Sequence, residues 1–259
     1  MKKNLVERVI LLHDINSSRG TGMQDHESRY LLSWDVVNKG IDEALNNLIQ
    51  FEKLQFIEKN NNNEKFVRLT IDDGGGSSVD IADHLARKNI KAYFFIPTKF
   101  IGENGFLKKD DINKLIEMGH VVGSHSHTHP NPFCELDELK IKQEVIESKK
   151  ILEEITQQKI TTFSVPGGEI RKKTLKILSD DELGLEEIYI STPYQGKYYF
   201  SDMDSSKVFG RLCIERKMSY RDVSKYIKGD GWKFVFFDYQ LRRFRRELIY
   251  KYNHIFKNN

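Results

Sequence analysis

Phe66-Val67-Arg68-Leu69-Thr70-Ile71-Asp72-Asp73-Gly74-Gly75-Gly76 is the stretch that decides the fold. Apolar and polar residues alternate over 66–71, which predicts a β-strand. The strand stops at two carboxylates and three glycines, and a helical pattern follows from about 79 to 88. The stretch is therefore a strand, loop and helix with a carboxylate pair at the carboxyl end of the strand.

The same unit recurs on both sides of this stretch. We expect further strands at 9–12, 92–96, 121–122, 161–165 and 187–191, and further helices at 33–57, 109–118, 135–158 and 171–179. Strands that alternate with helices predict a parallel βαβ architecture, whose sites lie at the carboxyl ends of the strands. Residues 232–237 alternate like one more, late strand.

Length and composition set limits on the class of protein. The 259 residues suit one large domain, and a hydrophobic content of 39% supplies a core. A net charge of +3, from 41 basic and 38 acidic residues, gives no electrostatic argument for nucleic acid as a partner. Only two cysteines occur, Cys134 and Cys213, which argues against a disulfide scaffold or a cysteine zinc knot.

The N-terminal segment gives an expectation about location. Its apolar run, 9–12, is too short for a signal peptide or a membrane span. The sequence therefore predicts a soluble, cytoplasmic protein.

Three histidines fall within five residues, at His125, His127 and His129. On a helical turn the first and third share a face, and on an extended strand all three do. Either geometry presents two imidazoles to one divalent metal ion. The alternative is a surface loop that contains histidines by chance.

The carboxylate pair Asp72 and Asp73 adds what a histidine pair lacks, a hard anionic ligand with a free carboxylate beside it. A His-His-Asp site with open positions is typical of a metal hydrolase. The alternative is an Asp-Asp-Gly turn that caps the next helix.

Several motifs in this order resemble those of polysaccharide deacetylases of the NodB-homology group, carbohydrate esterase family 4. Residues 70–74 resemble its T-F-D-D-G motif, residues 125–129 its H-[ST]-x-x-H motif, and residues 92–96 the A-T-F-F-V strand between them. Residues 163–168 fall where its R-x-P-x-G motif is expected, and residues 11–14 are similar to an M-Y-H strand. The resemblance covers 66–192.

The resemblance implies a distorted (β/α) barrel of about seven parallel strands, which we expect to form a single domain over residues 1–259. It also implies the metal-dependent removal of an N-acetyl group from an amino sugar. The roles that it assigns are metal ligation by Asp73, His125 and His129, the general base at Asp72, and an oxyanion donor at the backbone N–H of Gly167. Zinc suits two histidines and one aspartate, and cobalt, nickel or manganese fit the same ligands. His127 then lies between the ligands, as an accessory residue.

Two departures from the family pattern leave roles open. The arginine of the third motif is Ser164 here, and Arg68 or Arg211 can in principle replace it. The late L-x-I-H motif is matched by a Leu-Cys-Ile-Glu run that ends at Glu215. Glu215 can protonate the leaving amine if its pKa is raised, and His13 or a metal-bound water is the alternative.

Substrate and partners follow less directly. The missing export signal favours an acetylated amino sugar that is nucleotide- or lipid-linked, as in surface-polysaccharide assembly. The C-terminal segment is basic, and a solvated helix face or a peripheral contact with an anionic membrane or a diphosphate substrate both fit its arginines, Arg242, Arg243, Arg245 and Arg246.

Two rival functions remain at this point. One is a deformylase or amidase that acts on another C–N bond with the same four residues. The other is a sugar-binding homologue that has lost turnover, since the motif arginine and histidine are missing.

Overall fold

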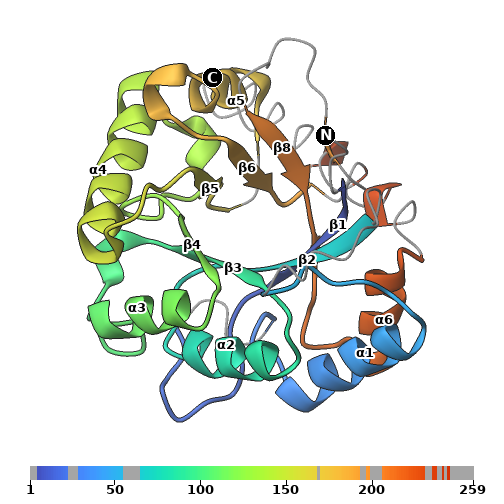
Figure 1. Ribbon diagram of the computed structural model, residues 1–259. Helices are drawn as coiled ribbons and strands as arrows, with labels where there is room; N and C mark the ends of the chain where they lie inside the picture. Colours follow the sequence, from blue (N-terminus) through green and yellow to red (C-terminus); the bar gives the residue numbers. More distant parts are fainter. Residues whose placement is uncertain are drawn as a thin grey trace, which may run out of the picture.

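One curled sheet organises the molecule. The computed structural model describes residues 5–22, 29–54, 65–167, 170–192, 197–198 and 206–230, and a few positions between 235 and 245. The sheet has nine strands in the order β7-β8-β6-β5-β4-β3-β2-β1-β9, and the helices lie outside the ring that it forms (Figure 1). The strands are β1 (Leu5–Leu12), β2 (Lys65–Ile71), β3 (Ala92–Ile96), β4 (Val121–Ser124), β5 (Thr162–Ser164), β6 (Glu187–Ile190), β7 (Lys197–Tyr198), β8 (Lys207–Gly210) and β9 (Leu212–Cys213).

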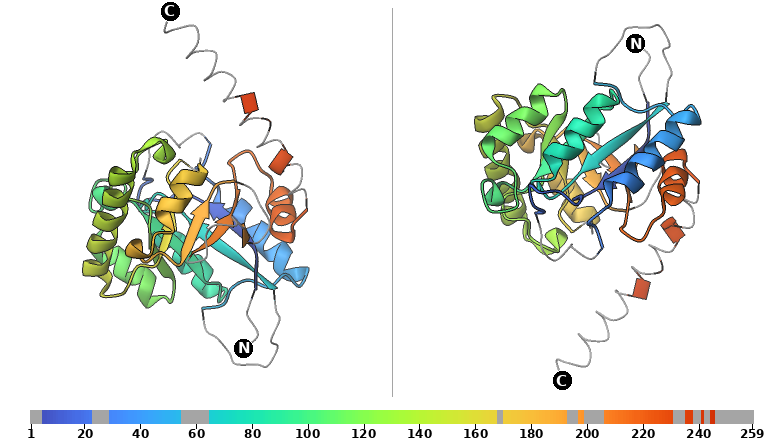
Figure 2. Two further views of the ribbon diagram at one scale, coloured as in Figure 1. Left: turned by 90° about the horizontal axis from the view of Figure 1, so that it is seen from above. Right: turned by 90° about the horizontal axis from the view of Figure 1, so that it is seen from below.

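Helices cover the outer face of the sheet. The α-helices are α1 (Trp34–Asn46), α2 (Ser78–Arg87), α3 (Lys109–Glu117), α4 (Glu138–Thr156), α5 (Lys172–Leu178) and α6 (Tyr220–Lys228), and three short 3-10 helices are η2 (Thr98–Phe100), η3 (Phe133–Glu135) and η4 (Asp181–Leu183). Helices α1 and α6, from opposite ends of the described chain, lie side by side (Figure 2). Among the described residues, no helix has the length and apolarity to cross a membrane.

The parallel part of the sheet begins and ends in one stretch of chain. Strand β8 pairs with β6, β9 pairs with β1, and only Arg211 separates them. This stretch therefore closes the ring. Of the nine strands only β7 is antiparallel, which leaves eight parallel strands. The predicted distorted (β/α) barrel is confirmed, with eight parallel strands instead of about seven; the single-domain boundary 1–259 stays a prediction.

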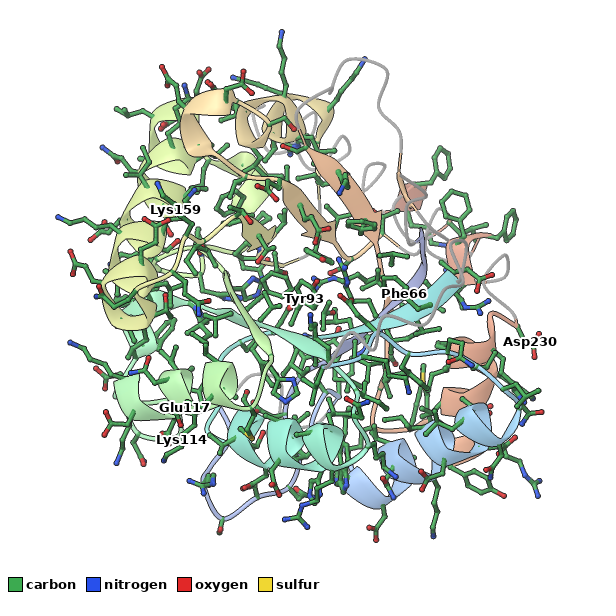
Figure 3. All side chains as sticks on the ribbon, in the orientation of Figure 1. Phe66, Tyr93, Lys114, Glu117, Lys159 and Asp230 are labelled. Carbon is green, nitrogen blue, oxygen red and sulfur yellow. The ribbon has the colours of Figure 1, made fainter. Side chains whose placement is uncertain are left out.

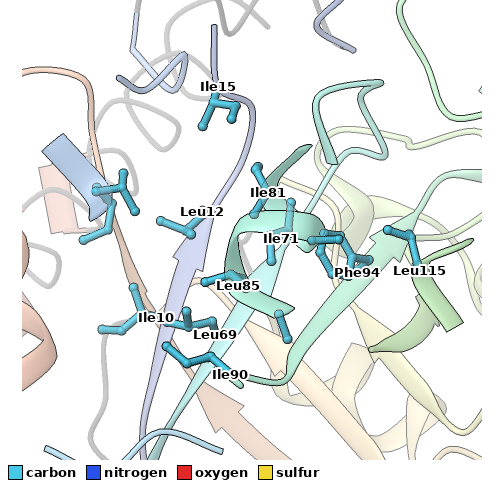
Figure 4. Close-up of a cluster of buried hydrophobic side chains, with 14 of the residues drawn as sticks. Ile10, Leu12, Ile15, Leu69, Ile71, Ile81, Leu85, Ile90, Phe94 and Leu115 are labelled. Atoms are coloured by element: carbon cyan, nitrogen blue, oxygen red, sulfur yellow. The ribbon is translucent and has the colours of Figure 1, made fainter. Parts of the chain in front are cut away.

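The alternation in β2 sorts its side chains between two environments. Leu69 and Ile71 pack against Ile81 and Leu85 of α2, in the core between sheet and helices (Figure 4). The intervening side chains point into the barrel, and they are Arg68, Thr70 and Asp72. The period of two thus delivers Asp72 to the barrel interior at the carboxyl end of the strand.

Aromatic rings fill the barrel below Asp72. The Tyr189 ring centre lies 4.9 Å from that of Phe95 and 5.4 Å from that of Phe209. Figure 3 shows Tyr93 inside the ring of strands, whereas Lys114 lies on the outer helix α3. The interior is therefore a packed core and not a channel.

Arg68 lies among these rings and is fully engaged there. Its Nε donates to Glu52 Oε2 at 2.6 Å and its Nη1 to Glu187 Oε2 at 2.7 Å. The same Nη1 donates to the hydroxyl of Tyr189. Because these partners hold the guanidinium low in the barrel, Arg68 does not replace the motif arginine.

Two predicted elements are wrong. The helix expected over 33–57 ends at Asn46, because Leu48 takes a positive φ of 61° and Phe51 then pairs with Val67 beside β2. The late strand expected at 232–237 is contradicted at 235–237, which are helical, and its remaining residues lie outside the described part of the chain.

Candidate functional site

The predicted site residues converge at one end of the barrel. They follow the carboxyl ends of four strands and are His13 after β1, Asp72 and Asp73 after β2, His125 after β4 and Arg211 after β8, and Ser164 at the end of β5 joins them. Parallel strands bring their carboxyl ends to one rim, so residues far apart in sequence meet there.

Asp73 is the centre of a three-residue cluster. Its Oδ1 lies 3.3 Å from His125 Nε2 and 3.4 Å from His129 Nε2. One ligand atom from each residue lies within 4.8 Å of the others. Ligand bonds of about 2.1 Å in tetrahedral geometry place neighbouring ligand atoms about 3.4 Å apart, so the spacing fits a zinc-sized ion.

The protonation of His125 supports the same conclusion. Its Nδ1 lies 2.8 Å from the carbonyl oxygen of Ser164, which only accepts, so Nδ1 carries the proton and Nε2 presents its lone pair to Asp73. Burial lowers the pKa of His125, but the charges of Asp72 and Asp73 outweigh it and raise the pKa. The lone pair on His125 Nε2 and the carboxylate of Asp73 repel each other at 3.3 Å unless a cation, either a proton or a metal ion, lies between them. The residues present therefore fit a divalent metal.

Helix α4 fixes the loop that carries these histidines. The Glu144 carboxylate accepts the N–H of His127 at 2.9 Å, the N–H of Thr128 at 2.8 Å and the Thr128 hydroxyl at 2.6 Å. Ser126 and His129 have positive φ values of 65° and 56°. Because non-glycine residues rarely adopt this backbone, such contacts are needed to hold the loop.

His127 faces away from the cluster. Its Nδ1 lies 2.8 Å from Thr98 Oγ1, and its Nε2 lies 3.4 Å from Glu147 Oε1. The middle histidine is therefore not placed to share an ion with Asp73.

Asp72 is held by a buried guanidinium. Arg211 Nη1 donates to Oδ1 and Nη2 to Oδ2, both at 2.8 Å, while the Ser164 hydroxyl donates to Oδ2 at 2.8 Å. Burial raises the pKa of Asp72, but the charges of Arg211 and His125 outweigh it and lower the pKa. The carboxylate is thus ionised and oriented, with Oδ2 3.7 Å from His125 Nε2.

Arg211 places a guanidinium against both Asp72 and Ser164. Its Nη2 also donates to Ser164 Oγ at 2.9 Å, so the small serine leaves room for an arginine that follows β8, two strands away in the sheet. The capping alternative for the Asp-Asp-Gly turn is wrong for Asp72, because its oxygens bind these two residues and Ser77 is the N-cap of α2.

The glycine run after Asp73 accommodates another buried carboxylate. Asp14 Oδ1 accepts from the Ser77 hydroxyl at 2.7 Å and Oδ2 from the N–H of Gly22 at 2.9 Å. A Cβ on Gly75 would lie 2.0 Å from Asp14 Oδ1. Glycine is therefore required at this position.

His13 lies beside the cluster. Its Nε2 is 4.0 Å from Asp73 Oδ2, its ring stacks on Tyr30 at 4.5 Å between centres, and its Nδ1 is 3.8 Å from Cys213 Sγ. The imidazole is thus fixed on two sides at the edge of the site.

Glu215 does not meet the condition set for a proton donor. Arg29 Nη2 donates to its Oε1 at 2.6 Å. Burial raises the pKa of Glu215, but Arg29 and Lys217 outweigh it and lower the pKa. The raised pKa on which the proton-donor prediction for Glu215 depended is therefore absent, and we do not carry that prediction further.

Gly167 follows β5 in a left-handed conformation with φ of 67°. A Cβ there would lie 2.3 Å from Asn131 Oδ1, which explains the glycine. Its role as an oxyanion donor stays a prediction.

Sequence reasoning missed three contributors to this site. Ser164 was noted only as a departure, although its hydroxyl and carbonyl both orient site residues. Glu144 lies within a long charged helix, and Tyr30 lies in a loop. No pattern in the sequence distinguishes these two from their neighbours.

Comparison with known proteins shows similarity to one family. The polysaccharide deacetylase family model matches residues 59–186. A peptidoglycan-N-acetylglucosamine deacetylase of Bacillus cereus is 28% identical over 132 residues, which are 50% of this chain and 46% of the relative. Another, from Listeria monocytogenes, is 28% identical over 189 residues, which are 67% of this chain and 38% of the relative. The chain spans less than half the length of these relatives.

Solved structures share the fold. A polysaccharide deacetylase from Bacillus cereus superimposes with a TM-score of 0.68 at 17% identity, covering 85% of this chain and 68% of that one. A Streptococcus pyogenes deacetylase in complex with acetate also gives 0.68 at 17% identity, covering 87% of this chain and 99% of that one.

Proposed function

We propose, from the premise that residues 59–186 belong to the polysaccharide deacetylase family, that this protein is a metal-dependent hydrolase that removes the N-acetyl group from an amino sugar. One observation supports it above the others. An ionised, guanidinium-held carboxylate, Asp72, lies beside the cluster of Asp73, His125 and His129.

Asp73, His125 and His129 would hold the metal. When bound, such an ion polarises the acetamide carbonyl and acidifies water. Zinc is our first choice, with cobalt, nickel or manganese as alternatives for the same donors.

The chain's other residues would handle protons and charge. Asp72 takes the proton from the attacking water, while Arg211 and Ser164 keep its oxygens in place. His13 gives a proton to the leaving amine, a role that its place 4.0 Å from Asp73 supports. The N–H of Gly167 stabilises the oxyanion.

Similarity to the family and to the deacetylases named above supports our choice of substrate class. We assign an acetylated amino sugar of a glycan or glycan precursor in surface-polysaccharide biosynthesis. A nucleotide- or lipid-linked form, a cytoplasmic location and a peripheral membrane contact stay predictions from the sequence. Of the four tail arginines, Arg245 is exposed, and Arg242, Arg243 and Arg246 lie outside the described residues.

The structure bears on one of the two rival functions. An impaired, sugar-binding homologue was suggested by the missing motif arginine and histidine. The two hydrogen bonds from Arg211 to Asp72 support Arg211 as the substitute for the arginine, and His13 is our candidate for the role of the histidine. We therefore favour an enzyme. The deformylase or amidase alternative uses the same residues and is separated by its product.

The test measures acetate released from N-acetylglucosamine oligomers by the metal-loaded protein. We expect turnover in the wild type and in the control Asp83→Asn, whose carboxylate pairs with Arg87 on the surface, and none in Asp72→Asn. Formate or ammonia release from other amides, without acetate release from acetamido sugars, would replace the proposal with the deformylase or amidase.

A further inference from the structure

A basic pocket of about 500 Å³ is lined by Arg29, Glu215, Arg216 and Lys217. Three cations and one carboxylate give this lining a net charge of +2. The lining comes from two segments of the chain, one at Arg29 and one at residues 215–217. The N–H of Arg216 donates to the carbonyl of Arg29 at 2.8 Å, which joins the two segments into one wall of the pocket.

Glu215 contacts both Arg29 and Lys217, and its single negative charge leaves the lining positive. It accepts from Arg29 Nη2 at 2.6 Å and lies 3.4 Å from Lys217 Nζ. Its side chain is only 14% exposed, whereas those of Arg29 and Lys217 are 49% and 81% exposed. Since a guanidinium has five N–H donors, one bond to Glu215 leaves Arg29 with donors for a ligand.

The pocket adjoins the candidate catalytic residues. The Arg29 guanidinium carbon lies 5.3 Å from the centre of the Tyr30 ring, which stacks on His13. His13 in turn lies 4.0 Å from Asp73 and 3.8 Å from Cys213, two residues before Glu215. A substrate that reaches Asp73 past His13 therefore lies near Arg29.

We propose that this pocket is an anion subsite that binds a phosphate or carboxylate substituent of the amino-sugar substrate. The inference rests on the proposed function and narrows its substrate class to an anionic acetamido sugar. Arginine and lysine bind such groups through charge-assisted hydrogen bonds, which a neutral sugar does not form. Glu215 stands where the family's late motif has histidine, so the pocket belongs to this chain's own departure from that motif.

The test measures binding and not turnover. The Asp72→Asn protein is titrated calorimetrically with N-acetylglucosamine 1-phosphate, N-acetylmuramic acid and neutral N-acetylglucosamine. We expect at least one anionic sugar to bind about 10-fold tighter than the neutral one at low salt, and less so at high salt. The preferred anion identifies the substituent as phosphate or carboxylate.

Variants locate the effect. Arg29→Gln and Lys217→Gln should each lower the affinity for the anionic sugar about 10-fold and leave the affinity for the neutral sugar unchanged. We expect this in metal-loaded and chelator-treated protein alike. The matched control is Lys114→Gln on the outer helix α3, with a side chain that is 51% exposed. Retained preference in chelator separates the pocket from phosphate bound to the metal.

Three results would overturn the subsite: equal affinity for charged and neutral sugars, no measurable binding of either anionic sugar, or charge variants that behave like Lys114→Gln. The proposed function fails separately. An intact, Arg29-dependent anion preference in a protein that releases no acetate contradicts the deacetylase while supporting the subsite.

Discussion

Replacing Arg211 with methionine removes one guanidinium from the barrel while keeping an unbranched side chain of similar length. The wild-type residue makes two parallel bonds of 2.8 Å to Asp72. In Arg211→Met the carboxylate of Asp72 stays buried with the Ser164 hydroxyl as its remaining donor from this group.

The loss of unfolding free energy in Arg211→Met follows from the burial of the pair that it breaks. The side chains of Arg211 and Asp72 are 0% and 4% exposed, and breaking such a pair from one side costs about 3–5 kcal/mol. Total stability is about 5–15 kcal/mol for an ordinary domain, so the loss is large. Asp72→Asn leaves the guanidinium buried without its anion, and the double variant removes both charges. We therefore expect the double variant to be about 2 kcal/mol more stable than the sum of the single changes implies.

Urea unfolding of the wild type, both single variants and the double variant, in chelator at pH 7, measures this coupling. The control cycle is Asp83 with Arg87, an exposed i,i+4 pair on α2 with N···O of 2.7 Å, for which about 0.3–0.5 kcal/mol is expected. Additivity of the Arg211 and Asp72 changes within about 0.5 kcal/mol would refute the reasoning.

Three further predictions concern the histidine loop, the glycine run and a buried histidine at the amino end of β4. Glu144→Gln should weaken metal binding about 10-fold in a chelator competition, because the loop that carries the histidines loses its charged acceptor. Glu147→Gln, about one turn further along α4, should leave metal binding unchanged. Gly75→Ala should destabilise the protein by about 1–3 kcal/mol and lower its Tm, since the new methyl would meet Asp14. Burial lowers the pKa of His120 below its unfolded value, so the unfolded state binds the extra proton first and stability falls as pH drops below about 6.5. His120→Gln should flatten that part of the profile of unfolding free energy against pH.

Each has its contrary result. Equal metal affinity in the Glu144 and Glu147 variants would show that the loop holds itself. An unchanged Tm in Gly75→Ala would contradict the close approach of Asp14. A pH profile that keeps its slope in His120→Gln would assign the titration to another group.

Local sequence patterns predict which residues lie at the strand ends, but not where α1 ends or which distant side chains contact Asp72. The alternation over 66–71 placed Asp72 at a strand end, and the structure has it there, because a period of two leaves little freedom once one face is buried. The end of α1 was missed, since the apolar pattern continues past Asn46 while the chain turns at Leu48 to pair with β2.

Long-range partners were beyond the sequence. Arg211 reaches Asp72 across 139 residues of chain, and Ser164 does so across 92. The sequence alone does not distinguish Arg68 from Arg211, whereas in the structure Glu52 and Glu187 hold Arg68 lower in the barrel. Closure of the sheet brings Arg211 and not Arg68 to Asp72, and no local sequence pattern predicts that closure.

The most direct test of metal-dependent deacetylation titrates Zn²⁺ into chelator-treated protein and follows acetate released from N-acetylglucosamine oligomers. We predict release that rises to a plateau at one ion per chain. Asp73→Asn should lose both ion binding and release, and Asp72→Asn should lose release while still binding the ion. Acetate release that persists in chelator, or an Asp73→Asn protein that binds zinc and turns over like the wild type, would contradict the account.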